Sequence, residues 1–315
     1  MLSDKIPHLY TLTPSQYNLF TRCLRVHAVS IPLLAIGDFV NNYMIIKCMN
    51  KLMWIANIIF YFIMISLDAI LYFRGKDLDY LIIATGISYL VYDIIAIVFS
   101  KILKTEDKVN IQDLKLCIKH GINMVVDRLL GKVATITYNI YASKLGTEVY
   151  AIHSICYSIA TFTEYITNQQ FNYQVIMLSP IDNIKDKWIK CKELFKKTFI
   201  PLGIIGYITS FILLLIIHGE VKIEVCIVPL ILYCSQAFLI QIYESLRGYL
   251  TSLQRSDLLK WAGLIGIFSR IPVTLISYYS GIGLYGFALA SSIDFICRGI
   301  YFYCCHKLII KRKRK

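Results

Sequence analysis

Three aspartates lie deep inside long apolar segments of this 315-residue chain, where a charge is costly to bury. They are Asp38, Asp93 and Asp127. A carboxylate in such surroundings can take up a proton or a cation and release it when the surroundings change. We therefore regard these three residues as candidates for binding an exchangeable ion. The alternative for Asp38 and Asp93 is a structural hydrogen bond to Asn41 or to nearby hydroxyl groups.

Further charges surround Asp127. Arg128 follows it directly, Lys132 lies one helical turn later, and Glu164 is at the same distance from the intervening turn at residues 145–146. Equal distance from the turn predicts equal depth in two antiparallel helices. Two interpretations stay open: a buried Arg128 to Glu164 ion pair that joins the helices, or Asp127 facing a cavity that holds a cation or proton.

A polar stripe follows Glu164 along one helix. Thr161, Glu164, Asn168 and Asn172 recur at intervals of three and four residues, which places them on one helical face. We expect that face to line a substrate cavity. The alternative is that these side chains form hydrogen bonds between helices.

A second charge cluster is predicted near the end of the chain. Asp294 precedes Arg298 by one helical turn, and Arg270 lies at similar depth across the turn at Gly281. Two arginines would keep the carboxylate of Asp294 ionised, so we predict a structural cluster here.

The elements that carry these residues are long apolar helices. The composition is 57% hydrophobic and 17% charged, with a mean hydropathy of +0.59, which excludes a soluble domain. Helices of about 20 residues span the hydrocarbon core of a membrane. The sequence predicts an all-α integral membrane protein with about nine transmembrane helices, at residues 26–46, 53–73, 80–103, 116–142, 149–178, 198–217, 221–246, 258–279 and 282–308.

The basic residues report the orientation in the membrane. Alternate loops and the tail carry 21 lysines and arginines on one side, against 7 on the other. The positive-inside rule predicts a multi-pass protein of the cell membrane with a cytoplasmic C-terminus and an N-terminus outside. The net charge of +13 therefore reflects topology and contact with the lipid bilayer, and we expect no nucleic-acid partner.

Metal and enzyme chemistry are not indicated. The ten cysteines and six histidines are dispersed, without the paired spacing of a metal site. We expect no metal, no cofactor other than a coupling H⁺ or Na⁺, and no enzymatic activity. An integral-membrane enzyme is the alternative, and it would gather a nucleophile and a base or metal ligands at one interface.

Two parts of the chain follow the same plan of three helices and short turns. They are residues 30–103 and 234–308, closed by Lys101 and Lys307. If the repeating unit has about 205 residues, three helices are missing before the first copy. We expect that restoring them would give six helices in each half.

Several late motifs resemble the multidrug and toxic compound extrusion (MATE) transporters. The family's "LRG" turn, "RIP" helix and "GIGLxG" turn are similar to Leu246–Gly248, Arg270–Pro272 and Gly281–Gly286, and its last helix to Asp294 with Arg298. "ASKLGTEVYAIHSI" and "SIPLLAIGDF" also resemble family segments. The resemblance begins near Tyr10 and leaves the family's first three helices without a counterpart.

The resemblance implies two helical bundles around a central cavity, with export of small organic compounds, cationic or amphipathic, by H⁺ or Na⁺ antiport and alternating access. It also implies a coupling carboxylate at position 236 in sodium-coupled relatives. Here the residue is Gln236, which can bind substrate but carries no titratable charge. We read Glu244 with Arg247 as a surface pair three residues apart.

The expected organisation has five parts: a polar outer segment (1–25), a partial N-terminal bundle (26–103), a cytoplasmic linker (104–114), a C-terminal six-helix bundle (115–308) and a basic tail (309–315). Two alternatives to drug export stay open. A lipid-linked saccharide flippase would use Arg128 and Lys132 to contact a pyrophosphate. A truncated subunit would be inactive until a complementary three-helix fragment completes it.

Overall fold

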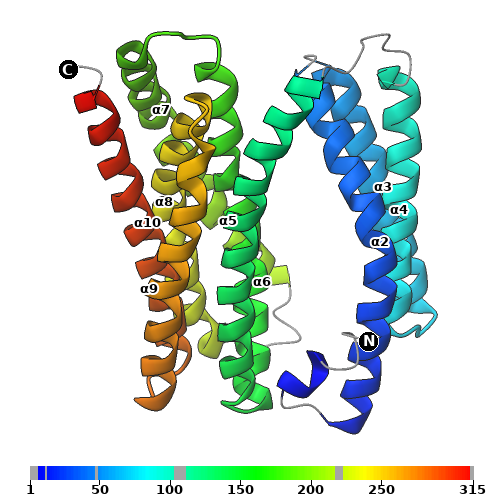
Figure 1. The fold of residues 1–315 in the computed structure, drawn as a ribbon. Helices are drawn as coiled ribbons and strands as arrows, with labels where there is room; N and C mark the ends of the chain where they lie inside the picture. Colours follow the sequence, from blue (N-terminus) through cyan, green and yellow to red (C-terminus); the bar gives the residue numbers. More distant parts are fainter. Residues whose placement is uncertain (1–5, 11–12, 47–48, 103–110, 217–222, 313–315) are drawn as a thin grey trace. The chain divides into compact units, whose positions relative to one another are not determined.

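The computed structural model describes residues 6–10, 13–46, 49–102, 111–216 and 223–312. Within these ranges the chain forms nine long α-helices, and no strand is found (Figure 1). The helices are α2 (Pro14–Ile46), α3 (Asn50–Phe73), α4 (Leu78–Ser100), α5 (Ile111–Ser143), α6 (Thr147–Leu178), α7 (Ile184–Ile216), α8 (Ile223–Ser252), α9 (Leu259–Tyr279) and α10 (Leu284–Arg312). Two short 3₁₀ helices occur at η1 (Ile6–Leu9) and η3 (Ser256–Leu258).

The helices fall into two compact units, unit 1 (Met1–Val109) and unit 2 (Asn110–Lys315). In unit 1, α4 packs against both α2 and α3. Their contact buries Val40 and Met44 of α2, Phe60 of α3, and Tyr92 and Ala96 of α4. Unit 1 is therefore a three-helix bundle with a small apolar core.

Unit 2 holds the other six helices. Helix α6 packs against α8 and α7, while α9 packs against α5 and α10, and α10 also packs against α8. Three apolar cores result: one around Tyr243 and Phe302, one around Leu214 and Leu230, and a smaller one around Phe287. Helix α8 contributes to the first two cores, which explains why its second half, from Ile240 on, is almost wholly buried.

The outer surface of both units is apolar. Trp54, Phe62 and Phe73 of α3 and Phe268 of α9 are more than half exposed, which suits contact with lipid. Among the described residues, seven helices are long and apolar enough to cross a membrane. Helices α5 and α6 have the length but carry too many charged and polar side chains to meet the same hydropathy limit. The chain is a multi-pass membrane protein.

Two helices begin more than ten residues earlier than the sequence predicted. Helix α2 starts at Pro14, so much of the segment expected to be polar and outside, 1–25, is helical. The reason is a capping box: the backbone N–H of Thr13 donates to Oε1 of Gln16 at 3.0 Å, and the N–H of Gln16 lies 3.5 Å from Oγ1 of Thr13. Proline is favoured at the first helical position that follows.

Helix α7 starts at Ile184, 14 residues before the predicted residue 198. Asn183 caps it, because its Oδ1 accepts a hydrogen bond from the backbone N–H of Lys185 at 2.9 Å. The lysine-rich segment after this cap is thus part of the helix. The predicted linker (104–114) becomes helical from Ile111; its residues 104–110, and residues 313–315 of the basic tail, lie outside the described residues.

Candidate functional site

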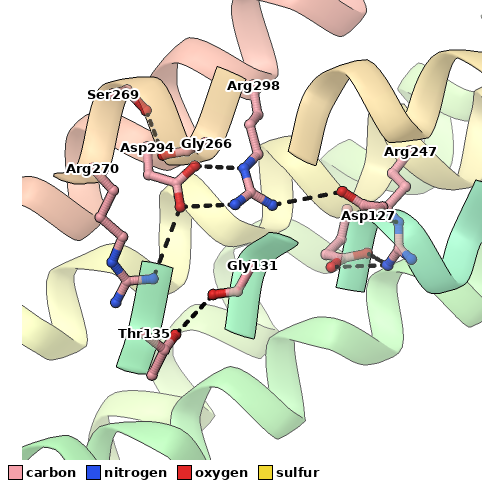
Figure 2. A network of polar contacts seen from close by, with 10 residues as sticks. Asp127, Gly131, Thr135, Arg247, Gly266, Ser269, Arg270, Asp294 and Arg298 are labelled. Carbon is pink, nitrogen blue, oxygen red and sulfur yellow. Dashed lines mark hydrogen bonds and ion pairs between the residues drawn. The ribbon is translucent and has the colours of Figure 1, made fainter. Parts of the chain in front are cut away.

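Six buried charged side chains alternate in sign through the interior of unit 2. Figure 2 shows Asp294 between Arg270 and Arg298, and Arg298 linked onward to Asp127. We call this chain of contacts the charge network. In spatial order it consists of Glu244, Arg247, Asp127, Arg298, Asp294 and Arg270.

One half of the charge network joins α8 to α5. Nη1 of Arg247 lies 3.1 Å from Oε2 of Glu244, three residues earlier on α8. Nε of Arg247 lies 3.5 Å from Oδ2 of Asp127 on α5. Arg247 is 1% exposed and Asp127 is 2% exposed, so both charges are removed from solvent.

The other half joins α5 to α10 and α9. Nη1 of Arg298 is 3.8 Å from Oδ1 of Asp127, and its Nη2 donates to Oδ2 of Asp294 at 3.0 Å. Arg270 of α9 completes the series, with Nη1 3.9 Å from the same oxygen of Asp294. The charge network therefore connects four helices.

Three carboxylates and three guanidinium groups give the charge network no net charge, which makes its burial tolerable. An isolated buried charge is very costly, whereas a paired one recovers much of that cost from its partner. Each guanidinium also lies over an aromatic ring: Arg247 over Phe171 at 4.6 Å, and Arg270 over Tyr138 at 4.8 Å. Arg298 lies over Tyr243 at 5.6 Å.

A pocket of about 130 Å³ opens beside the charge network. Helix α6 contributes Tyr157, Glu164 and Asn168 to it, and α5 contributes Arg128 and Lys132. Its remaining polar lining includes network members such as Asp127 and Glu244. Carboxylates, cationic groups and aromatic rings thus line one pocket.

The predicted polar stripe of α6 divides in the structure. Glu164 and Asn168 line the pocket, whereas Thr161 and Asn172 are not among its lining residues. Thr161 donates to the carbonyl oxygen of Tyr157 at 2.8 Å, one turn back on its own helix. Only the middle of the polar stripe, at Glu164 and Asn168, lines the pocket.

Gln236 also lies away from the pocket. Its side chain is buried, and Nε2 donates to the carbonyl oxygen of Ala288 on α10 at 3.0 Å. This contact ties α8 to α10. The expectation that Gln236 contacts substrate therefore has no support from the pocket geometry.

Of the two interpretations of Arg128 and Glu164, the structure decides against the buried ion pair that would join the helices. In the part of the chain that the structure describes, no ion pair joins these two side chains, and Arg128 is exposed. Consecutive helical residues point about 100° apart. Because Asp127 faces α8 and α10, Arg128 must turn away from them, and it does not join the structural cluster with Arg270, Asp294 and Arg298.

The structure brings together the cluster expected at Asp294, Arg298 and Arg270, and the pair of Glu244 with Arg247. That pair is buried, however, and not at the surface as predicted. Asp127 lies between two arginines in the same way as Asp294. Its carboxylate is therefore a member of the charge network, as that of Asp294 is.

Sequence reasoning missed how closely α9 approaches this cluster. A side chain at Gly266 of α9 would overlap the guanidinium of Arg298, and one at Gly263 would lie 3.1 Å from Cα of Asp127. The spacing of these two glycines, one helical turn apart ahead of Arg270, was the available signal. It marks a face where another helix and a bulky side chain come close.

Asp93 in unit 1 is a different kind of buried acid. It is 3% exposed, and within the described residues neither carboxylate oxygen has a hydrogen-bond partner. Its Oδ1 packs against α2 so closely that a Cβ on Gly37 would lie 2.9 Å away. Asp38, on the same helix as Gly37, is exposed. Of these two candidates, only Asp93 is enclosed by the protein.

Among the described histidine, cysteine, aspartate and glutamate residues, no group of three or more is arranged to hold a metal ion. The carboxylates near one another in unit 2 have arginine as their neighbours instead.

Comparison with known proteins identifies the fold. No family model and no curated protein matches the sequence. Solved structures do match: an inward-facing multidrug resistance MATE family transporter of the MOP superfamily (TM-score 0.69, 13% identity, 98% of this chain and 75% of that chain) and MATE in complex with MaL6 (TM-score 0.71, 13% identity, 99% and 75%). MATE in the bent conformation matches at TM-score 0.66 and 12% identity, over 96% and 71% of the two chains. The chain therefore has the fold of the MATE transporters.

Proposed function

We propose that this protein is a secondary active transporter that exports small organic compounds from the cell in exchange for H⁺ or Na⁺. The observation that carries the proposal is the likeness to MATE transporter structures, at TM-scores of 0.66 to 0.71 over 96% or more of the chain. One of those structures is described as a multidrug resistance transporter. Transport would follow an alternating-access cycle, as in other secondary transporters.

Ion coupling is assigned to Asp93. Antiport needs a group that binds the coupling ion in one state of the cycle and releases it in the other. An enclosed carboxylate without a hydrogen-bond partner meets that need. Its neutral, protonated form is far cheaper to bury than its ionised form, so a rearrangement that hydrates it would release the proton. Asp38 is the next candidate, and Asp127 follows because it already has two arginine partners.

Substrate binding is assigned to the pocket beside the charge network. Glu164 and Asn168 offer a carboxylate and an amide, and Tyr157 offers an aromatic face. These groups suit the charged and flat parts of an amphipathic organic cation.

The test is efflux from vesicles. Purified protein would be reconstituted with a fluorescent organic cation inside, and release would be followed after a pH gradient or a Na⁺ gradient is imposed. The proposal expects release that needs one of the gradients and stops when an ionophore collapses it. A parallel sample with a co-expressed fragment of three membrane-spanning helices would distinguish an autonomous transporter from an incomplete subunit. Absence of gradient-driven release in both samples would contradict the proposal.

The second candidate function is flipping of a lipid-linked saccharide. The observation that favours it is the exposure of Arg128 and Lys132, one turn apart on α5, both lining the pocket. Two exposed cationic groups at this spacing could bind a pyrophosphate. Loss of a fluorescent lipid pyrophosphate from one leaflet, without release of the organic cation, would favour this function over drug export.

A further inference from the structure

We infer that unit 2 carries a binding site for one anionic phospholipid in a crevice between α7 and α10. Both helices pack against α8, and the crevice lies where they flank it. Its volume is about 190 Å³. We call it the lipid crevice, and its lining residues are Trp188, Cys191, Lys192, Phe195, Ile242, Ser245, Leu246 and Tyr303.

The interior of the lipid crevice is built for hydrocarbon. On α7, Trp188, Cys191 and Phe195 recur at helical spacing and face one side, while Ile242 and Leu246 of α8 form the floor. Ser245 is the single small polar residue of the floor, and its hydroxyl accepts a hydrogen bond from Nε2 of Gln174 at 3.0 Å. An acyl chain can therefore lie in the crevice without stranding a polar group.

The crevice lies at the end of unit 2 where a headgroup would be. Trp188, near the start of α7, stacks on His306, near the end of α10, with 3.7 Å between ring centroids. Lys187 of α7 donates to the carbonyl oxygen of Ser252 at the end of α8 at 2.7 Å. Trp and Tyr rings gather at the membrane interface, where one edge meets headgroups and the other meets hydrocarbon.

Two lysines at the rim of the lipid crevice favour a lipid with an anionic headgroup. Nζ of Lys192 lies 5.9 Å from the ring centroid of Trp188, and Nζ of Lys307 lies 4.8 Å from that of Tyr303. Trp188 stacks on His306, the residue directly before Lys307, so this contact brings the two lysine-bearing segments together. Two cations held over aromatic rings beside an apolar crevice match a phosphate joined to an acyl chain.

Neither lysine forms an ion pair with a residue that the structure describes. In the described parts of the chain, no carboxylate lies within 4.0 Å of either ammonium group. The nearest acid along α7, Glu193, pairs with Lys190 at 3.0 Å and with Lys197 at 2.8 Å. The positive charges of Lys192 and Lys307 are therefore available to attract an anionic lipid.

Tryptophan fluorescence offers a direct test. The chain has three tryptophans, so Trp54→Phe with Trp261→Phe leaves Trp188 as the sole reporter, inside the lipid crevice. This variant would be reconstituted in phosphatidylcholine vesicles with increasing fractions of brominated phosphatidylglycerol or brominated phosphatidylcholine. Bromine quenches tryptophan only at close range. We expect half-maximal quenching at a mole fraction of phosphatidylglycerol at least threefold lower than for phosphatidylcholine.

Matched variants distinguish lipid binding at the crevice from a general attraction of the basic protein for anionic lipids. Lys192→Gln with Lys307→Gln should abolish the preference for phosphatidylglycerol. The control is Lys76→Gln with Lys144→Gln, which removes two exposed lysines outside the crevice that also lie over tyrosine rings, at 5.4 Å and 4.8 Å. This control variant should keep the preference for phosphatidylglycerol.

A further variant tests occupancy of the crevice itself. Ile242 is 40% exposed at the floor, so Ile242→Phe adds bulk there with little disturbance of the core, and it should weaken quenching by both lipids. Circular dichroism would verify that each variant is folded. Equal quenching of the parent by the two lipids would overturn the inference. So would a preference for phosphatidylglycerol that survives the substitution of Lys192 and Lys307. A preference that is lost when Lys76 and Lys144 are substituted would also overturn it.

Discussion

The guanidinium group of Arg298 occupies the space in which a side chain at Gly266 would lie. This close approach of α10 to the backbone of α9 lets Arg298 reach Asp294 and Asp127 together. Only glycine permits it, since even a methyl group at position 266 would overlap the guanidinium carbon and two of its nitrogens.

Gly266→Ala should therefore displace Arg298 from the charge network. Overpacking and the loss of buried charge pairs together predict a destabilisation of about 3 kcal/mol. Thermal unfolding in detergent, followed with a thiol-reactive dye on the buried cysteines, would measure the change. Gly299→Ala on α10 is the control, because its added methyl group would lie 3.9 Å from Ile242, an ordinary contact. An equal effect of the two substitutions would count against the steric argument.

Arg247 should be far more important for folding than Arg128. Arg247→Gln leaves Glu244 and Asp127 buried without their shared partner, which predicts a loss of about 3 to 5 kcal/mol. Arg128→Gln alters an exposed side chain and should cost less than about 0.5 kcal/mol. Denaturation in mixed detergent would compare them. If Arg128→Gln proved as costly as Arg247→Gln, a pairing of Arg128 with Glu164 would have to be reconsidered.

Asp93→Asn should separate coupling from stability. The amide keeps the shape but cannot take up or release a proton, so we expect gradient-driven efflux to fall at least tenfold. The melting temperature should stay the same or rise, because the variant removes an unpartnered buried carboxylate. Two controls should retain efflux: Asp77→Asn, which alters an exposed carboxylate, and Gln236→Ala, which alters a residue away from the pocket. Full efflux by the Asp93 variant would move the coupling site elsewhere.

The orientation prediction can be tested with reporter fusions. A fluorescent protein that folds only in the cytoplasm should be active after Lys315, and a phosphatase that is active only outside should work near Lys144. The distribution of basic residues motivates this expectation. Within unit 2, Leu145 lies near Gly283, while Trp188 stacks on His306, so alternate turns gather at opposite ends of the bundle. Reporter activity that places Lys144 and Lys315 on the same side of the membrane would refute the predicted topology.

Residues close in sequence explain the parts of the site that could be predicted. Asp294 and Arg298 are four residues apart on one helix, and Glu244 and Arg247 are three apart, so helical geometry alone brings each pair together. Helix starts carry local signals too, as in the cap by Asn183, although the lysines that follow it suggested a loop.

The amino-acid sequence by itself determined that this chain enters a membrane as a series of long helices, because apolar length and backbone hydrogen bonding leave few other choices. Only the tertiary structure decided which charges meet. Asp127 and Arg247 are far apart in the chain, and their contact depends on how α5 and α8 are rotated about their axes. A rotation of about 100°, one residue, would have presented Arg128 in place of Asp127. The packing of glycine faces and buried side chains fixes that rotation, and it is a property of all six helices of unit 2 together.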